Sequence, residues 1–189
     1  MSLITYQDSL TMPVNKLEEI VHGESRIMPP VHKRHAYLIT ELSKQLERQL
    51  DDNAYEVLIQ RAGLGIERNP LTYRIPNLMV FRNEALRQDR LETAEDDPYI
   101  WFVPELLVEC LSPTNSKGPI QELLADYARI AVPEVWLLDP KPPQFTSYRY
   151  ESGALKQWLA IETGRVTPFL LPNATVDLAE LWAAFEGLA

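Results

Sequence analysis

The chain has 189 residues, of which 46% are hydrophobic and 24% are charged, and its formal net charge is −9. A chain of this length can bury a full hydrophobic core, so we expect a single domain over residues 1–189 that needs no disulfide or structural metal. The excess of acidic side chains argues against broad electrostatic attachment to nucleic acid, because such attachment depends on lysine and arginine.

The sequence also predicts a cellular compartment. A single cysteine, Cys110, cannot form an internal disulfide, which is typical of a reducing cytoplasm. Residues 1–15 lack a basic region followed by an apolar stretch, so we expect no secretory signal. No apolar run approaches the roughly 20 residues that cross a bilayer. We therefore expect a cytoplasmic protein with no membrane segment.

The first half of the chain predicts strands around one long helix. Residues 17–27 predict a short strand or hairpin that turns at Gly23, and apolar residues at helical spacing predict a helix over 35–50. Strands are then expected at 55–61, 64–67 and 73–81. Residues 84–99 are rich in charge without a clean period, which favours a loop with at most one short helical turn.

The second half predicts a crossover unit followed by hairpins. A strand over 100–111, a helix over 120–130 and a buried strand over 135–138 form a strand–helix–strand unit, in which the two strands run parallel. Three further strands are expected at 145–150, 155–161 and 165–166, with turns at Ser152-Gly153 and Thr163-Gly164. A last helix is expected over 177–185. The whole pattern predicts an α/β fold with a mixed sheet.

One carboxylate stands where a core residue is expected. Glu109 follows the apolar run Leu106 to Val108, and an unpaired carboxylate buried in a strand costs several kcal/mol. Glu109 must therefore be hydrogen-bonded, ion-paired, raised in pKa or bound to a cation.

These residues also carry a family resemblance. Pro76-Asn77, the block Val108 to Pro113, Asp126-Tyr127 and the segment Val132 to Asp139 resemble a restriction-endonuclease-like family that is abundant in cyanobacteria, within the PD-(D/E)XK nuclease superfamily. The resemblance implies a restriction-endonuclease-like fold (α/β, or α+β) with a central mixed β-sheet flanked by helices. It further implies hydrolysis of DNA phosphodiester bonds with Mg²⁺ or Mn²⁺.

The resemblance also implies site residues. Glu109 matches the second acidic metal ligand, Asn77 takes the position of the preceding aspartate, and Glu24 matches an acidic residue that could complete the metal site. His35 matches a histidine that could contact a phosphate or transfer a proton. Carboxylate oxygens from adjacent strands suit magnesium, which prefers hard oxygen ligands.

Two positions depart from the family pattern. Asn77 contributes no negative charge, and Leu123 stands where the family has a lysine four residues before its helical tyrosine, here Tyr127. Lys117 could reach back toward the site in place of the missing lysine. Because two of three central positions are altered, we expect weak or absent metal binding and an impaired or inactive nuclease.

Three interpretations remain open. The first is an enzyme with a rearranged site. The second is an inactive protein that binds nucleic acid through a basic patch around Lys33, Arg34 and Lys117. The third is a protein-interaction module, for example a homodimer, which the acidic balance favours over the second.

Overall fold

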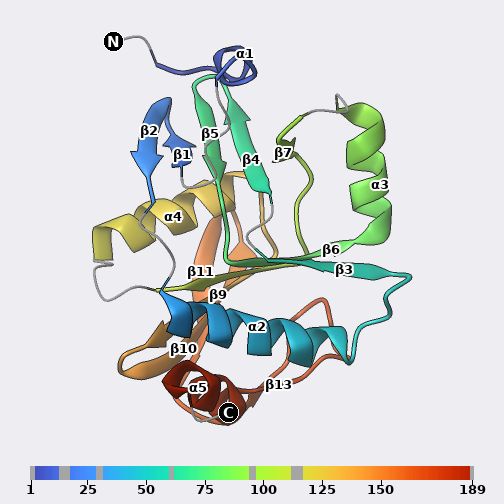
Figure 1. Ribbon diagram of the computed structural model, residues 1–189, viewed down its shortest axis with the longest axis vertical. Coiled ribbons are helices and arrows are strands. Elements are labelled where there is room, and N and C mark those ends of the chain that lie inside the picture. The colour runs from blue at the N-terminus through green and yellow to red at the C-terminus, as the bar shows by residue number, and fades with distance from the viewer. Residues whose placement is uncertain are drawn as a thin grey trace.

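The computed structural model describes residues 3–12, 18–28, 32–59, 62–93, 97–111 and 117–187. The elements follow one another as drawn in Figure 1. The helices are α1 (Tyr6–Ser9), α2 (Lys33–Glu47), α3 (Asn83–Glu92), α4 (Lys117–Arg129) and α5 (Leu178–Glu186). The strands are β1 (Glu18–Val21), β2 (Glu24–Ile27), β3 (Tyr55–Leu58), β4 (Gly63–Arg68), β5 (Leu71–Arg74), β6 (Leu78–Arg82), β7 (Tyr99–Ile100), β8 (Leu106–Cys110), β9 (Glu134–Pro140), β10 (Pro143–Glu151), β11 (Ala154–Ile161), β12 (Arg165–Val166) and β13 (Val176–Asp177).

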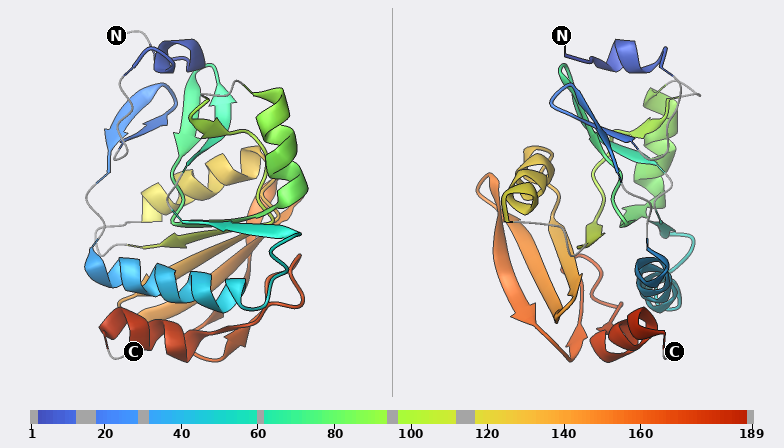
Figure 2. Two further views of the ribbon diagram at one scale, coloured as in Figure 1. Left: turned by 45° about the vertical axis from the view of Figure 1, so that its right-hand side comes forward. Right: turned by 60° about the vertical axis from the view of Figure 1, so that its left-hand side comes forward.

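A six-stranded mixed sheet forms the centre of the fold, in the order β11-β10-β9-β8-β6-β3. Its β8 and β9 are parallel and are joined through α4, as the crossover pattern predicts, while its other neighbouring strands are antiparallel. Helices α2 and α5 cover one face and α4 covers the other (Figures 1 and 2). The predicted mixed sheet flanked by helices is therefore confirmed.

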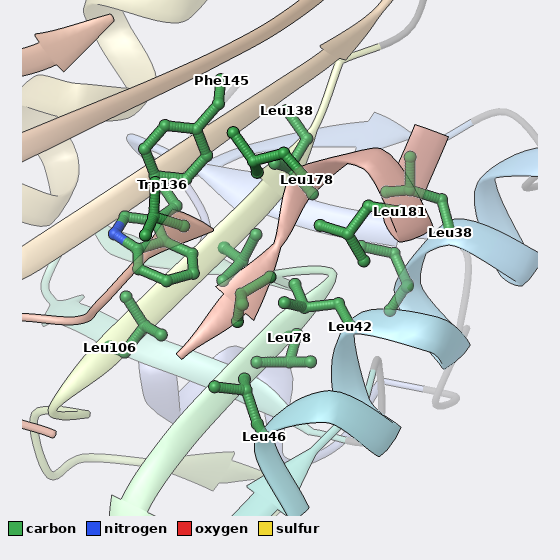
Figure 3. Close-up of a cluster of buried hydrophobic side chains, with 14 of the residues drawn as sticks. Leu38, Leu42, Leu46, Leu78, Leu106, Trp136, Leu138, Phe145, Leu178 and Leu181 are labelled. Carbon is green, nitrogen blue, oxygen red and sulfur yellow. The ribbon is translucent and has the colours of Figure 1, made fainter. Parts of the chain in front are cut away.

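The main core lies between this sheet and helices α2 and α5. Leu38, Leu42 and Leu46 recur at helical spacing along α2, and all three are fully buried. They meet the sheet near Trp136, whose ring packs edge-on against Phe145 at 5.0 Å between centroids. Figure 3 shows this interdigitation from α2 across to the strands. Alternate residues of β8 and β9 face the opposite core under α4, so both strands are apolar throughout.

A second sheet has five strands, in the order β2-β1-β5-β4-β7. Its β1–β2 hairpin turns at Gly23, whose φ of +79° is a left-handed conformation that favours glycine. The hairpin prediction for residues 17–27 is therefore confirmed over residues 18–27, but the sequence did not predict a second sheet.

Two predicted single strands are in fact divided between the sheets. The prediction of one strand over 73–81 is wrong, because the chain passes from β5 in the five-stranded sheet to β6 in the six-stranded sheet. The interruption contains Pro76, which has no N–H to donate to a ladder. The prediction of one strand over 100–111 is wrong for a similar reason, since β7 and β8 also belong to different sheets.

Two further local predictions are corrected. Residues 83–92 form helix α3 rather than a loop. Leu86 faces the core, and Asp89 is also buried and accepts the Trp101 N–H, while the other charged residues of α3 are exposed. The turn at Thr163-Gly164 does not close a hairpin, because β12 pairs with β13. The remaining predicted strands and helices are confirmed, with boundaries that shift by a few residues. Residues 60 and 61, at the end of the strand predicted over 55–61, lie outside the described residues. In the described part of the chain, no helix is long and apolar enough to cross a membrane.

The core assignment predicts a stability difference between two leucines. Leu42 is fully buried, whereas Leu91 on α3 is 85% exposed. Leu42→Ala should lower the free energy of unfolding by about 2–5 kcal/mol because it leaves a cavity. Leu91→Ala, the matched control, should change it by less than about 0.5 kcal/mol. Urea denaturation followed by circular dichroism measures both, and equal effects would contradict the assignment.

Candidate active site

Glu109 and Asn77 lie at the adjoining ends of β8 and β6, two neighbouring strands inside the six-stranded sheet. Asn77 immediately precedes β6, and Glu109 is near the end of β8. The two strands are antiparallel with Leu78 opposite Val108, so the start of one meets the end of the other. The Cys110 backbone N–H donates to Asn77 Oδ1 at 2.6 Å. The structure therefore brings together the two residues that the sequence placed at the centre of a metal site.

Tyr127 holds the Glu109 carboxylate from the helix above. Its side chain is fully buried on α4, and its hydroxyl donates to Glu109 Oε1 at 2.5 Å. Burial raises the pKa of Tyr127 well above its ordinary value, so the hydroxyl stays neutral and can donate. The second Glu109 oxygen takes no part in this bond.

The surroundings of Glu109 favour its protonated form. Part of its surface is accessible, but the protein around it is dense enough that desolvation raises its pKa from 4.5 to about 8. The Tyr127 hydroxyl lowers this pKa, the nearby charge of Glu19 raises it, and the Asn77 backbone and Arg74 lower it. Glu109 is therefore largely protonated at neutral pH, and a cation that binds there must displace a proton.

A buried ion cluster adjoins the pair. Arg74, at the end of β5, donates through Nε and Nη2 to Asp126 Oδ2 at 3.0 and 2.6 Å, and through Nη1 to Glu19 Oε2 at 3.1 Å. All three residues are less than 9% exposed. Burial alone would lower the pKa of Arg74, but the two carboxylates outweigh it and raise that pKa. The cluster therefore stays charged, because each ion is paired.

Glu19 is a site residue that the sequence reasoning missed. It lies on β1, and its Oε1 accepts the Ile75 N–H at 2.8 Å. The missed signal was the spacing of Glu19 from Val21. The two residues are two positions apart on a strand, so their side chains lie on the same face, and both are buried. Glu24, which the resemblance matched to the metal site, is instead exposed on β2, where its charge raises the pKa of Arg26.

A second ion pair closes the outer side of the cluster. Arg26 of β2 binds Glu122 of α4 through two bonds, at 2.7 and 2.9 Å. His22 Nε2 lies 3.6 Å from Asp126 and 3.8 Å from Glu122. These contacts tie the β1–β2 hairpin to α4 above the buried charges.

The other predicted site residues lie apart from this pair. The ring of His35 packs against that of Phe185 on α5, with 5.8 Å between the centroids. Burial, and to a lesser extent the charge of His32, lowers the pKa of His35. Lys117 is the first residue of α4, but its side chain lies outside the described part of the structure. Leu123 of α4, at the position of the family lysine, packs among the apolar side chains between this helix and the sheet.

The donor set limits which metal could bind. Among the described residues, no three His, Cys, Asp or Glu side chains converge as a metal-binding group. Glu109 and Asn77 still offer hard oxygens from adjoining strand ends, and magnesium is usually held by one or two protein carboxylates with water as its other ligands. The pair therefore fits a weakly held Mg²⁺ or Mn²⁺ once Glu109 is ionised.

Comparisons with known proteins identify a family and a similar fold. The family model described as "Uma2: Putative restriction endonuclease" matches residues 6–183. A solved structure of a "putative nuclease belonging to DUF820" from Anabaena variabilis is similar, with a TM-score of 0.77 and 15% identity over 96% of this chain and 99% of that chain. At this identity the likeness shows the fold alone. No curated protein matches the chain.

The raised pKa of Glu109 predicts a fall in stability with rising pH. The folded state keeps the proton up to about pH 8, whereas the unfolded state releases it near 4.5, so folding binds a proton between these values. The free energy of unfolding should therefore decrease as pH rises through this interval, by up to a few kcal/mol. Glu109→Gln cannot ionise and should flatten the slope.

Urea denaturation at pH 5.5 and pH 8 measures this slope. Glu186→Gln, an exposed position on α5, is the matched control and should keep the wild-type slope. Equal slopes for the wild type and Glu109→Gln would show that Glu109 is not held protonated.

Proposed function

The chain belongs to the Uma2 family, and on this premise we propose that it is a metal-dependent DNA endonuclease whose phosphodiester hydrolysis is impaired in this copy. The observation that carries the proposal is the Glu109–Asn77 pair, held together at adjacent strand ends through the Cys110 N–H. The family match and the fold support a nuclease-like role.

The metal would be Mg²⁺ or Mn²⁺, held by Glu109 and Asn77. Bound there, such a cation supplies Lewis acidity to a phosphate oxygen and to water. Glu109 provides the one negative charge of the pair, and the Tyr127 hydroxyl keeps its carboxylate oriented. Asn77 Oδ1 has a remaining lone pair beside the Cys110 N–H and can serve as a neutral oxygen ligand.

Two features of the site explain the proposed impairment. Metal binding must remove the proton that burial keeps on Glu109, and Asn77 returns no charge to offset that cost. The position of the family lysine is occupied by Leu123 in an apolar environment, so α4 supplies no cation there to balance charge on a phosphate. Each loss weakens stabilisation of the transition state.

DNA is the proposed substrate, although the net charge is −9. The basic patch expected of an inactive DNA-binding protein would use Lys33 and Arg34 on α2 and Lys117 on α4. These helices lie on opposite faces of the six-stranded sheet (Figure 2). This arrangement argues against a broad basic surface that binds DNA. It favours a site that binds a phosphate group through a metal cation.

Restoring the lost charge should restore metal binding. Asn77→Asp is isosteric, can still accept the Cys110 N–H, and should bind Mn²⁺ at least about tenfold more tightly than the wild type. Isothermal titration calorimetry at pH 8 measures the affinity. Asn77→Asp/Glu109→Gln is the control and should lose the gain, because the two side chains share the cation.

The same variants test the chemistry. Asn77→Asp/Leu123→Lys should nick supercoiled plasmid with Mn²⁺, and adding Glu109→Gln should abolish nicking. Metal affinity that does not depend on Glu109, or no nicking in any variant, would contradict the proposal. Salt-sensitive DNA binding without cleavage would instead support an inactive nucleic-acid-binding protein.

A further inference from the structure

Among the described residues, Arg74 is the one arginine that is buried, and it lies beside the candidate site. It ends β5 in the five-stranded sheet, and its guanidinium binds Asp126 on α4 and Glu19 on β1. Its side chain is 7% exposed, and its Nη2 also lies 3.8 Å from Glu122 Oε2. A buried arginine of this kind is costly to desolvate, so its surroundings must fix it closely.

The contacts of Arg74 form part of a closed ring that includes Glu109 and Asn77. Arg74 binds Asp126, whose neighbour Tyr127 donates to Glu109. The residue after Glu109, Cys110, donates its N–H to Asn77. Only two residues separate Asn77 from Arg74 along the chain, which closes the ring.

Glu19 braces the short chain segment within this ring. Its Oε2 accepts from Arg74 Nη1 at 3.1 Å, and its Oε1 accepts the Ile75 N–H at 2.8 Å. One carboxylate thus fixes both the guanidinium and the backbone that leads into Asn77. A change at Arg74 therefore reaches Asn77 through Ile75 and reaches Glu109 through α4.

The charge of Arg74 also takes a place that α4 leaves vacant. Leu123 lies one helical turn before Tyr127 and packs among apolar side chains, so no cation comes from that position. Arg74 supplies positive charge from β5 instead, and this charge acts on both Glu109 and Tyr127.

We infer that Arg74 is a positioning residue for the Glu109–Asn77 pair, and that it supplies from β5 the positive charge that the family pattern places at the position of Leu123 on α4. This inference rests on the proposed function. Arg74 is fully engaged with carboxylates, so it acts through Asp126, Glu19 and the ring rather than by touching substrate. A purely structural role would be to join the five-stranded sheet to α4, and such a role would affect stability alone.

Arg74→Lys tests the inference, because lysine keeps the charge but loses the planar fork that binds both carboxylates. Arg129→Lys is the matched control: Arg129 also joins α4 to the five-stranded sheet, through Glu67, but its side chain is 40% exposed. The first readout is the backbone amide resonance of Cys110 in ¹⁵N-labelled protein without metal. It should shift in Arg74→Lys and stay unchanged in Arg129→Lys.

The second readout is the Mn²⁺ affinity of each variant in the Asn77→Asp background. Arg74→Lys should weaken that affinity by about tenfold, as loss of a supporting contact around a metal ligand does, and Arg129→Lys should not. Asp126→Asn weakens the same link and replaces Arg74→Lys if that variant does not fold.

The inference is overturned if Arg74→Lys lowers the melting temperature but leaves both the Cys110 resonance and the Mn²⁺ affinity unchanged. If Asn77→Asp itself binds no Mn²⁺, the proposed function fails. The metal-free Cys110 resonance then still decides whether Arg74 positions the pair.

Discussion

The antiparallel pairing of β6 with β8 is the constraint on which the rest of the site depends. Because Leu78 lies opposite Val108, the residue before β6 must lie beside the end of β8, and the Cys110 N–H reaches Asn77 Oδ1 at 2.6 Å. A shift of one residue in this register would turn Glu109 to the other face of the sheet, away from Tyr127. The buried leucines and valines on both faces of these strands oppose such a shift, so the packing of the core fixes the geometry of the site.

The buried charges near the Glu109–Asn77 pair are compensated by neighbouring ions of opposite sign rather than by solvent. Glu19, Arg74 and Asp126 are buried together and compensate one another, which lets the fold keep ions in a region where an isolated ion would be costly. Glu109 has no ion pair of its own among the described residues and receives a hydrogen bond from Tyr127 instead, so burial favours its neutral form. The same close packing that orients the Glu109 carboxylate therefore opposes the ionisation that metal binding requires. In this account, Asn77 removes the charge that would have made the exchange of a proton for a cation favourable.

Local patterns in the sequence predicted much of the fold. The spacing of Leu38, Leu42 and Leu46 gave the long helix, and the apolar runs on either side of Tyr127 gave the parallel strands β8 and β9. The division of residues 73–81 between two sheets could not be read in this way, because both halves form buried strands and only the distant partners of each half distinguish them. Glu109 was identified because a carboxylate in an apolar strand is anomalous. Glu19 and Arg74 were missed because each looks like an ordinary charged residue until strands and a helix that are remote in sequence bring them together. Their separation of 55 residues, and that of 52 between Arg74 and Asp126, lies beyond any local pattern.

The central claim is that Glu109 and the side chain at position 77 share one cation. Crystals of Asn77→Asp soaked with Mn²⁺ at pH 8, with diffraction data collected at the manganese absorption edge, test it most directly. The account predicts an anomalous peak at about 2.2 Å from carboxylate oxygens of both residues, with water completing the coordination. A peak held by surface carboxylates elsewhere, or no peak while Glu109 and Asp at position 77 remain ordered, would contradict it.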